Sequence, residues 1–83
     1  MDPIRVVEAA LFSSKPLKVS EMARTTNLQE AVVRSSIKRL AKEYRDRGSA
    51  IEIVKIGPKY SMQLRREFSD AARPFTEKEV PDE

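Results

Sequence analysis

Residues 29–47 read QEAVVRSSIKRLAKEYRDR, and their apolar positions recur at the spacing of one helix face. At 100° per residue, the stripe falls within about 120° and consists of Val33, Ile37, Leu40, Ala41 and Tyr44. This is the strongest periodic signal in the chain, and Gly48 provides a stop directly after it. The pattern predicts a long helix over residues 29–47 with one buried face.

After Gly48 the apolar period changes from that of a helix to that of a strand. The alternating apolar positions are Ile51, Ile53, Tyr60, Met62 and Leu64. Gly57-Pro58-Lys59 separates the two runs and is predicted to be a three-residue hairpin loop, with Gly57 free to take positive φ. Val54 and Ile56 break strict alternation, so both faces of the first strand are expected to be partly covered.

Two shorter helices are predicted upstream. Asp2-Pro3 is typical of a helix N-cap followed by proline at the first helical position, which indicates a helix over Pro3–Phe12. Leu17–Val19 has room for only a very short strand. Ser20 is expected to cap a helix from Glu21 to about Thr25, ended by Thr26-Asn27.

The order of these elements predicts an α+β fold of the winged helix-turn-helix type. It contains three helices and a two-stranded β-hairpin wing, with room for a short first strand. Residues 66–73 are expected to add one or two helical turns that pack Phe68 and Ala71 or Ala72. The winged-helix domain is thus predicted to span residues 1–73, and residues 74–83 are predicted to be an acidic linker or tail.

The composition argues against catalysis and metal binding. The 83 residues include no Cys and no His, which removes disulfides, the usual zinc ligands and the side chain that titrates near neutral pH. A chain of this size buries only about 60–65% of its unfolded surface, which leaves little for a deep substrate cleft. We therefore expect a non-enzymatic binding protein with no cofactor, no metal and no small-molecule ligand.

The net charge of +3 is unevenly distributed. Residues 1–75 hold 15 Lys or Arg and nine Asp or Glu, whereas residues 76–83 hold one Lys and four Asp or Glu. A moderately basic fold with an acidic tail permits contact with nucleic acid without requiring it. No apolar run approaches the roughly 18 residues of a membrane span, and no secretion signal opens the chain, so a cytoplasmic location is expected.

The predicted first helix is apolar on more than one side. Ile4, Val7 and Leu11 form one stripe, but further apolar residues cover most of the remaining circumference. One interpretation is a central core helix, and the other is a helix that also contributes to an interface with another chain. The candidate residues for such a dimer interface are Val6, Ala10 and Phe12.

The opposite face of residues 29–47 is basic. The candidate DNA contacts are Arg34, Lys38 and Lys42 on this face, and Lys55 and Lys59 on the wing. Glu30, Glu43 and Asp46 can pair locally with Arg34, Arg39, Arg47 and Lys42 and keep the face soluble without any ligand. The stripe lacks Asn and Gln, the usual readers of adenine. A solvated face, a weak sequence-independent DNA contact and a sequence-specific DNA reader all remain open.

Several segments in order resemble the family of segregation and condensation protein B. Residues 6–23, VVEAALFSSKPLKVSEMA, are similar to its opening Ile-Glu-Ala-Leu-Leu-Phe type helix, the Pro-Leu turn and the Glu-Leu-Ala helix that follow. The resemblance continues through the long charged helix, Leu28–Arg47. It extends into the hairpin, where residues 59–64, KYSMQL, are similar to the second wing strand of archaeal members. It covers roughly residues 4–72.

The resemblance implies an accessory subunit of a condensin-like complex built on structural-maintenance-of-chromosomes (SMC) ATPases. Members of this family bind the kleisin subunit, segregation and condensation protein A, usually form homodimers through the N-terminal domain, and have no catalytic residues of their own. They act at the nucleoid in chromosome condensation and segregation. They have two winged helices, so this chain is expected to be a fragment or a natural short form. The alternative, from the basic helix alone, is a DNA-binding transcriptional regulator.

Overall fold

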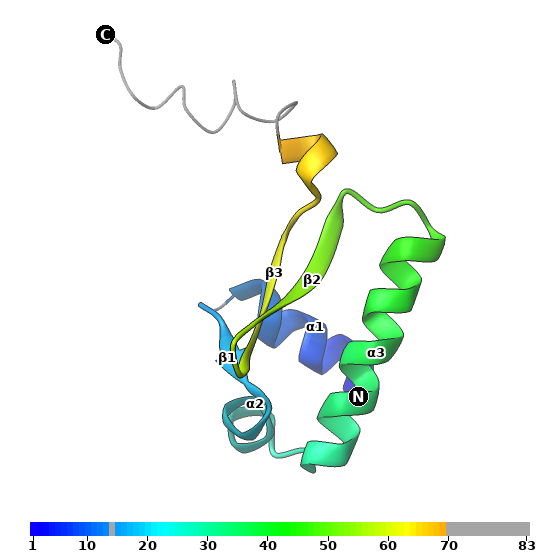
Figure 1. The fold of residues 1–83 in the computed structure, drawn as a ribbon. Helices are drawn as coiled ribbons and strands as arrows, with labels where there is room; N and C mark the ends of the chain where they lie inside the picture. Colours follow the sequence, from blue (N-terminus) through cyan, green and yellow to red (C-terminus); the bar gives the residue numbers. More distant parts are fainter. Residues whose placement is uncertain (14, 70–83) are drawn as a thin grey trace, which may run out of the picture.

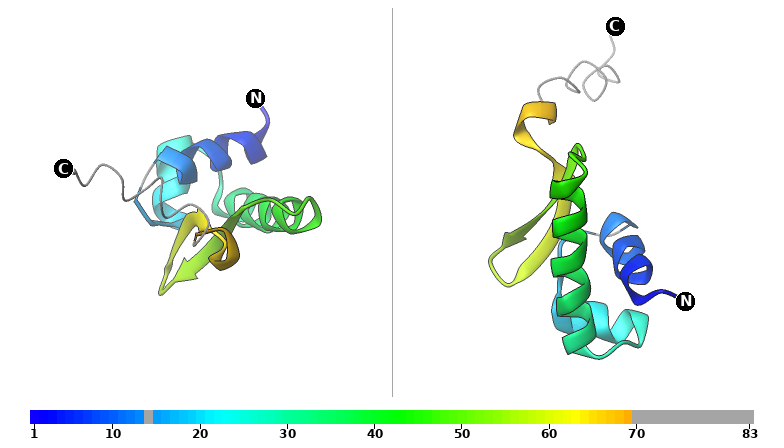
Figure 2. Two further views of the ribbon diagram at one scale, coloured as in Figure 1. Left: turned by 90° about the horizontal axis from the view of Figure 1, so that it is seen from above. Right: turned by 90° about the vertical axis from the view of Figure 1, so that its right-hand side faces the viewer.

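The computed structural model describes residues 1–13 and 15–69. The elements in order are α1 (Pro3–Ser13), β1 (Leu17–Lys18), α2 (Val19–Thr26), α3 (Glu30–Asp46), β2 (Ile51–Ile56) and β3 (Lys59–Leu64) (Figure 1). The strands form one antiparallel sheet in the order β1-β3-β2. Figure 2 shows α1 and the β2–β3 wing on two sides of α3. The predicted α+β winged-helix fold is confirmed, including the short first strand.

The core is built around α3. Its buried apolar side chains come from all three helices: Val7, Leu11, Met22, Val33, Ile37, Leu40 and Tyr44. Four of the five stripe positions on α3 are therefore buried as predicted, and Ala41 is half-buried. Ser36 is also buried, which its polar side chain did not indicate. The inner face of the sheet packs against this cluster through Ile51, Ile53, Tyr60 and Met62.

The wing closes with a two-residue turn, so the prediction of a three-residue loop is wrong. Ile56 and Lys59 are already paired across the strands, which leaves only Gly57 and Pro58 between them. Gly57 has a φ of 60°, and proline has a fixed negative φ, so the pair fits the type II′ pattern that matches the twist of a hairpin. The strand after the turn begins one residue earlier than expected.

The start of α2 also differs from the prediction. Val19 belongs to the helix and not to the strand, and Ser20 lies inside the helix and not at its cap. The cap is Lys18, whose backbone N–H donates to the Glu21 carboxylate at 2.8 Å. Pairing of β1 with β3 ends at Lys18, so the chain turns into the helix there. The left-handed Asn27 at the other end, with a φ of 62°, confirms the predicted stop.

Two apolar side chains remain more exposed than the sequence indicated. Val54 on the outer face of β2 is half-buried, but Ile56 is 54% exposed, so that face is covered only in part. Residues 66–69 form the predicted helical turn, yet Phe68 is 38% exposed. Ala71, Ala72 and the predicted domain boundary after residue 73 lie outside the described residues.

We expect Leu40→Ala to lower the free energy of unfolding by about 2–5 kcal/mol, because it leaves a cavity at the centre of the core. Leu40 has no exposed surface, whereas the neighbouring Arg39 is exposed. Arg39→Ala is the control, with an expected change within about 0.5 kcal/mol. Urea denaturation followed by circular dichroism measures both. Equal losses in the two variants would contradict the central position of α3.

Candidate interaction surfaces

A polar network holds α1 against α3. The Arg5 guanidinium donates to the Glu8 carboxylate at 2.7 Å and to the Glu43 carboxylate at 2.8 Å. The Tyr44 hydroxyl donates to the other oxygen of Glu8 at 2.5 Å. Both charged residues of α1 thus reach α3, a role that the sequence did not reveal because 35 or more residues separate them from Glu43 and Tyr44.

This network shifts the protonation of its members. The hydrogen bond from Tyr44, together with the hydrogen bond and the positive charge of Arg5, lowers the pKa of Glu8, although partial burial opposes the shift. Burial and the bond to Glu8 raise the pKa of Tyr44 well above its ordinary value. At neutral pH the contact therefore joins an ionised carboxylate and a neutral phenol, the stronger, charge-assisted form of a hydrogen bond.

The C-terminal end of α1 and the sheet together form an apolar surface beside this network. Phe12 is 76% exposed, and it lines a shallow hollow of about 220 Å³. The other apolar residues of this hollow are Ile51, Met62 and Leu64. We call this set of four residues the Phe12 face. The strand register explains why these residues lie together. Ile51 lies directly opposite Leu64, so both project from the inner side of the sheet, near the end of α1.

The three residues predicted for a dimer interface do not form one surface. Val6 and Ala10 are half-buried, whereas Phe12 is exposed. At 100° per residue, Phe12 lies about 200° around the helix from Ala10, so the two point in nearly opposite directions. Sequence reasoning also missed the partners of Phe12 on the sheet. The alternation in residues 51–64 showed that these residues share a face, but not that the edge of this face extends beyond the core.

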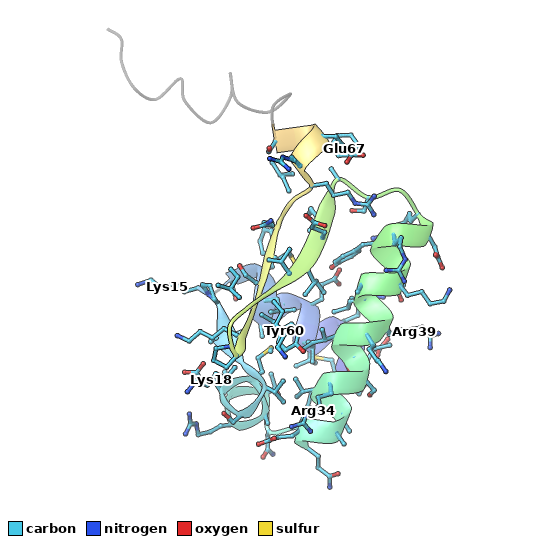
Figure 3. All side chains as sticks on the ribbon, in the orientation of Figure 1. Lys15, Lys18, Arg34, Arg39, Tyr60 and Glu67 are labelled. Carbon is cyan, nitrogen blue, oxygen red and sulfur yellow. The ribbon has the colours of Figure 1, made fainter. Side chains whose placement is uncertain are left out.

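The candidate DNA contacts separate into two groups. Arg34, Lys38 and Lys55 line a single groove between α3 and the wing, of about 610 Å³. Its apolar lining consists of Ala31, Ile37, Ala41, Ile53 and Tyr60. We call it the α3–wing groove. Figure 3 shows Tyr60 in the space between the wing and α3, with Arg34 on the neighbouring part of the helix.

Lys42 and Lys59 do not line this groove. The Lys42 ammonium group pairs with Asp46 at 2.5 Å, and Lys59 faces the outer side of the sheet opposite Ile56. Arg34, on the edge of the groove, pairs with Glu30 at 3.1 Å. The Lys55 ammonium group lies 5.8 Å from the centroid of the Tyr60 ring, within the range of a cation–π contact. Local carboxylates thus neutralise part of the predicted basic stripe, as expected for a solvated helix face.

Two negative observations apply to residues 1–13 and 15–69. No group of three or more carboxylates in this part of the chain is placed to hold a metal ion. None of its helices is long and apolar enough to cross a membrane.

The fold and these two surfaces define a small winged-helix domain, with an exposed apolar face formed by α1 and the sheet and a basic groove between α3 and the wing. The family model for segregation and condensation complex subunit ScpB matches residues 5–83. This match covers nearly the whole chain. The chain therefore belongs to the ScpB family.

Solved structures show the same fold. ScpB from Mycobacterium tuberculosis matches with a TM-score of 0.85 and 21% identity, covering 100% of this chain and 54% of that one. A conserved hypothetical protein from Chlorobium tepidum matches with a TM-score of 0.74 and 24% identity, covering 88% of this chain and 47% of that one. This chain thus spans about half the length of these two proteins.

A third structure is a dimer of the ScpB N-terminal domain complexed with an ScpA peptide. It matches with a TM-score of 0.77 and 22% identity, covering 87% of this chain and 91% of that one. At these identities the likeness establishes the winged-helix fold. No curated protein sequence matches the chain.

We expect Tyr44→Phe to lower the free energy of unfolding by about 1–3 kcal/mol at pH 7, because it removes a hydrogen bond to an ionised carboxylate. The pKa of Glu8 in the folded state is below its ordinary value of 4.5. The stabilisation is therefore fully present above that value and is lost as the pH falls through the lower, folded-state pKa.

The difference between the wild type and Tyr44→Phe should consequently shrink between pH 7 and pH 3 in urea denaturation. Tyr60→Phe is the matched control, because Tyr60 lies outside the α1–α3 network and its variant should show no such trend. A difference for Tyr44→Phe that is the same at both pH values would show that Glu8 does not use this bond.

Proposed function

We propose that this chain is a non-enzymatic, dimer-forming adaptor in an SMC–kleisin complex that condenses and segregates chromosomes at the nucleoid. The observation that carries the proposal is the match of the family model over residues 5–83. The Phe12 face adds physical support, because an exposed apolar surface beside a well-packed core is typical of a protein–protein contact. The winged-helix domain, taken as residues 1–73, is the binding unit.

The proposed partner is a segment of a kleisin subunit. The support comes from the structure in which an ScpB N-terminal domain dimer holds an ScpA peptide. That domain has nearly the same extent as this chain, since 91% of it is covered. The chain spans only 54% of the M. tuberculosis protein, so contacts made by the rest of such a protein are not assigned to it.

We place the dimer contact at the Phe12 face. A twofold dimer requires a surface that is complementary to itself, and Phe12 beside a shallow hollow lined by Ile51, Met62 and Leu64 has this form. The aromatic ring of one chain can enter the hollow of the other. Full burial of such a side chain contributes about 1.5–3 kcal/mol, and a twofold contact uses it twice.

Phe12→Glu should therefore weaken self-association by roughly 100–10,000-fold, since each 1.4 kcal/mol is a factor of ten. Sedimentation equilibrium at micromolar concentration measures it, with wild type expected at twice the chain mass of 9.5 kDa. Thr25→Glu introduces the same charge at an exposed site on α2 and should leave the dimer intact. A monomeric wild type at high concentration, or an intact Phe12→Glu dimer, would refute this surface.

A weak, sequence-independent contact with DNA is the second candidate function. The observation in its favour is that Arg34, Lys38 and Lys55 line one groove, although they come from α3 and the wing. Cations gathered from two elements can meet the phosphates of one duplex. The local pairing of Arg34 with Glu30 reduces this potential but does not remove the two lysines from the groove.

This candidate predicts duplex binding that weakens steeply with salt. Lys38→Ala combined with Lys55→Ala should lower the affinity and reduce the slope of log K against log salt by about 2, one unit for each lost phosphate contact. Fluorescence anisotropy with a short labelled duplex measures this, and Lys42→Ala with Lys59→Ala is the control pair. If wild type gives no anisotropy change at low salt, DNA contact is excluded, and the adaptor proposal is unaffected.

A further inference from the structure

Two adjoining hollows, which we together call the trough, lie between α3, the wing and the last described turn. One hollow lies between α3 and the 66–69 turn, and its lining includes Arg45, Arg66 and Glu67. This hollow and the α3–wing groove share two lining residues, Ala41 and Ile53. Together they form a path from the last described turn, along β2, toward the N-terminal half of α3. Figure 3 shows Glu67 on that turn and Arg34 near the far end of the path.

The trough has a strongly positive lining. Its cations are Arg34, Lys38, Arg45, Lys55, Arg65 and Arg66. Only two carboxylates, Glu52 and Glu67, line it among the described residues. Between the cations, Ile37, Ala41 and Ile53 provide an apolar floor. Such a trough is complementary to an extended segment that carries several carboxylates and one or two apolar side chains.

The chain itself contains a segment of this kind. Residues 74–83 read PFTEKEVPDE, with four carboxylates, one lysine and two large apolar side chains, Phe75 and Val80. The segment begins five residues after Ser69, the last described residue. An extended chain covers up to about 3.3–3.6 Å per residue, so residues 70–75 span roughly 20 Å. Ile53 lines the groove and pairs with Met62, which lies two residues along the strand from Leu64, so this end of the groove is about 7 Å from the end of β3.

We infer that residues 74–83 dock in the trough of their own chain, with carboxylates against Lys38 and Lys55 and the apolar side chains over Ile37 and Ile53. The contact is weak and sensitive to salt, because exposed ion pairs contribute little and are screened. The docked segment covers the same cations that a phosphate backbone would otherwise meet. The inference does not depend on the adaptor proposal, since it uses neither the Phe12 face nor a partner protein.

The absence of Cys from the chain permits a direct test. A nitroxide spin label attached to Thr76→Cys in the full chain broadens the amide NMR signals of nearby residues. If the segment docks, the amides of Lys38, Ala41 and Lys55 lose intensity at low salt and recover it at high salt. Amides of α1, which lies on the side of α3 opposite the wing (Figure 2), stay sharp. Broadening confined to residues 65–69 would overturn the proposal.

Charge reversal identifies the cations involved. Lys38→Glu with Lys55→Glu should abolish the broadening along α3. Arg39→Glu with Lys59→Glu makes the same change in charge outside the trough, and Arg39 lies on the side of α3 away from the wing (Figure 3), so broadening should persist. Equal broadening in both double variants would refute docking through these lysines.

An equal mixture of ¹⁵N-labelled chain and unlabelled, spin-labelled chain separates the two possible sources of the segment. Docking within one chain gives no broadening along the trough of the ¹⁵N-labelled molecules. Broadening at Lys38 and Lys55 in the mixture would overturn the proposal in favour of the segment of a second copy. The Phe12→Glu variant, measured in the same way, keeps this result independent of dimerisation.

Discussion

The whole fold depends on burial of one helix stripe. Val33, Ile37, Leu40 and Tyr44 of α3 are covered by α1 and α2 on one side and by the wing on the other. The other core residues, Val7, Leu11 and Met22, and the inner face of the wing all pack against this stripe. Once this stripe is buried, the remaining surface of α3 must face solvent, which explains why it is charged whether or not it binds anything.

The orientation of α1 connects the core to the apolar surface. Val7 and Leu11 enter the core, while Arg5 and Glu8 bond to Glu43 and Tyr44 of α3. With these two sides occupied, Phe12 is directed outward at the end of the helix, beside the rim of the sheet. The 76% exposure of Phe12 therefore follows from the orientation in which α1 packs against α3.

Helix caps and turns depend on a few neighbouring residues, and the sequence predicted them correctly only where no strand pairing changed the boundary. Asn27 ends α2 as its left-handed tendency indicated. At the other end of α2, β1 stops at Lys18, because its partner Lys59 is the first residue of β3. The helix therefore begins directly after Lys18, and Lys18 rather than Ser20 is its cap. In the hairpin, pairing of Ile56 with Lys59 shortened the expected loop to Gly57 and Pro58. Boundaries shift in this way because strand pairing supplies hydrogen bonds that the sequence alone does not locate.

The sequence by itself determined the winged-helix fold, the stripe on α3, the inner face of the wing and the exclusion of Cys and His chemistry. These features follow from periodicity and composition, which are properties of the linear chain. Only the tertiary structure decided which surface residues gather. It placed Phe12 with Leu64, and Lys38 with Lys55, but left Lys42 and Lys59 apart. The physical reason is that each surface joins segments distant in sequence, and their proximity is set by core packing and strand register.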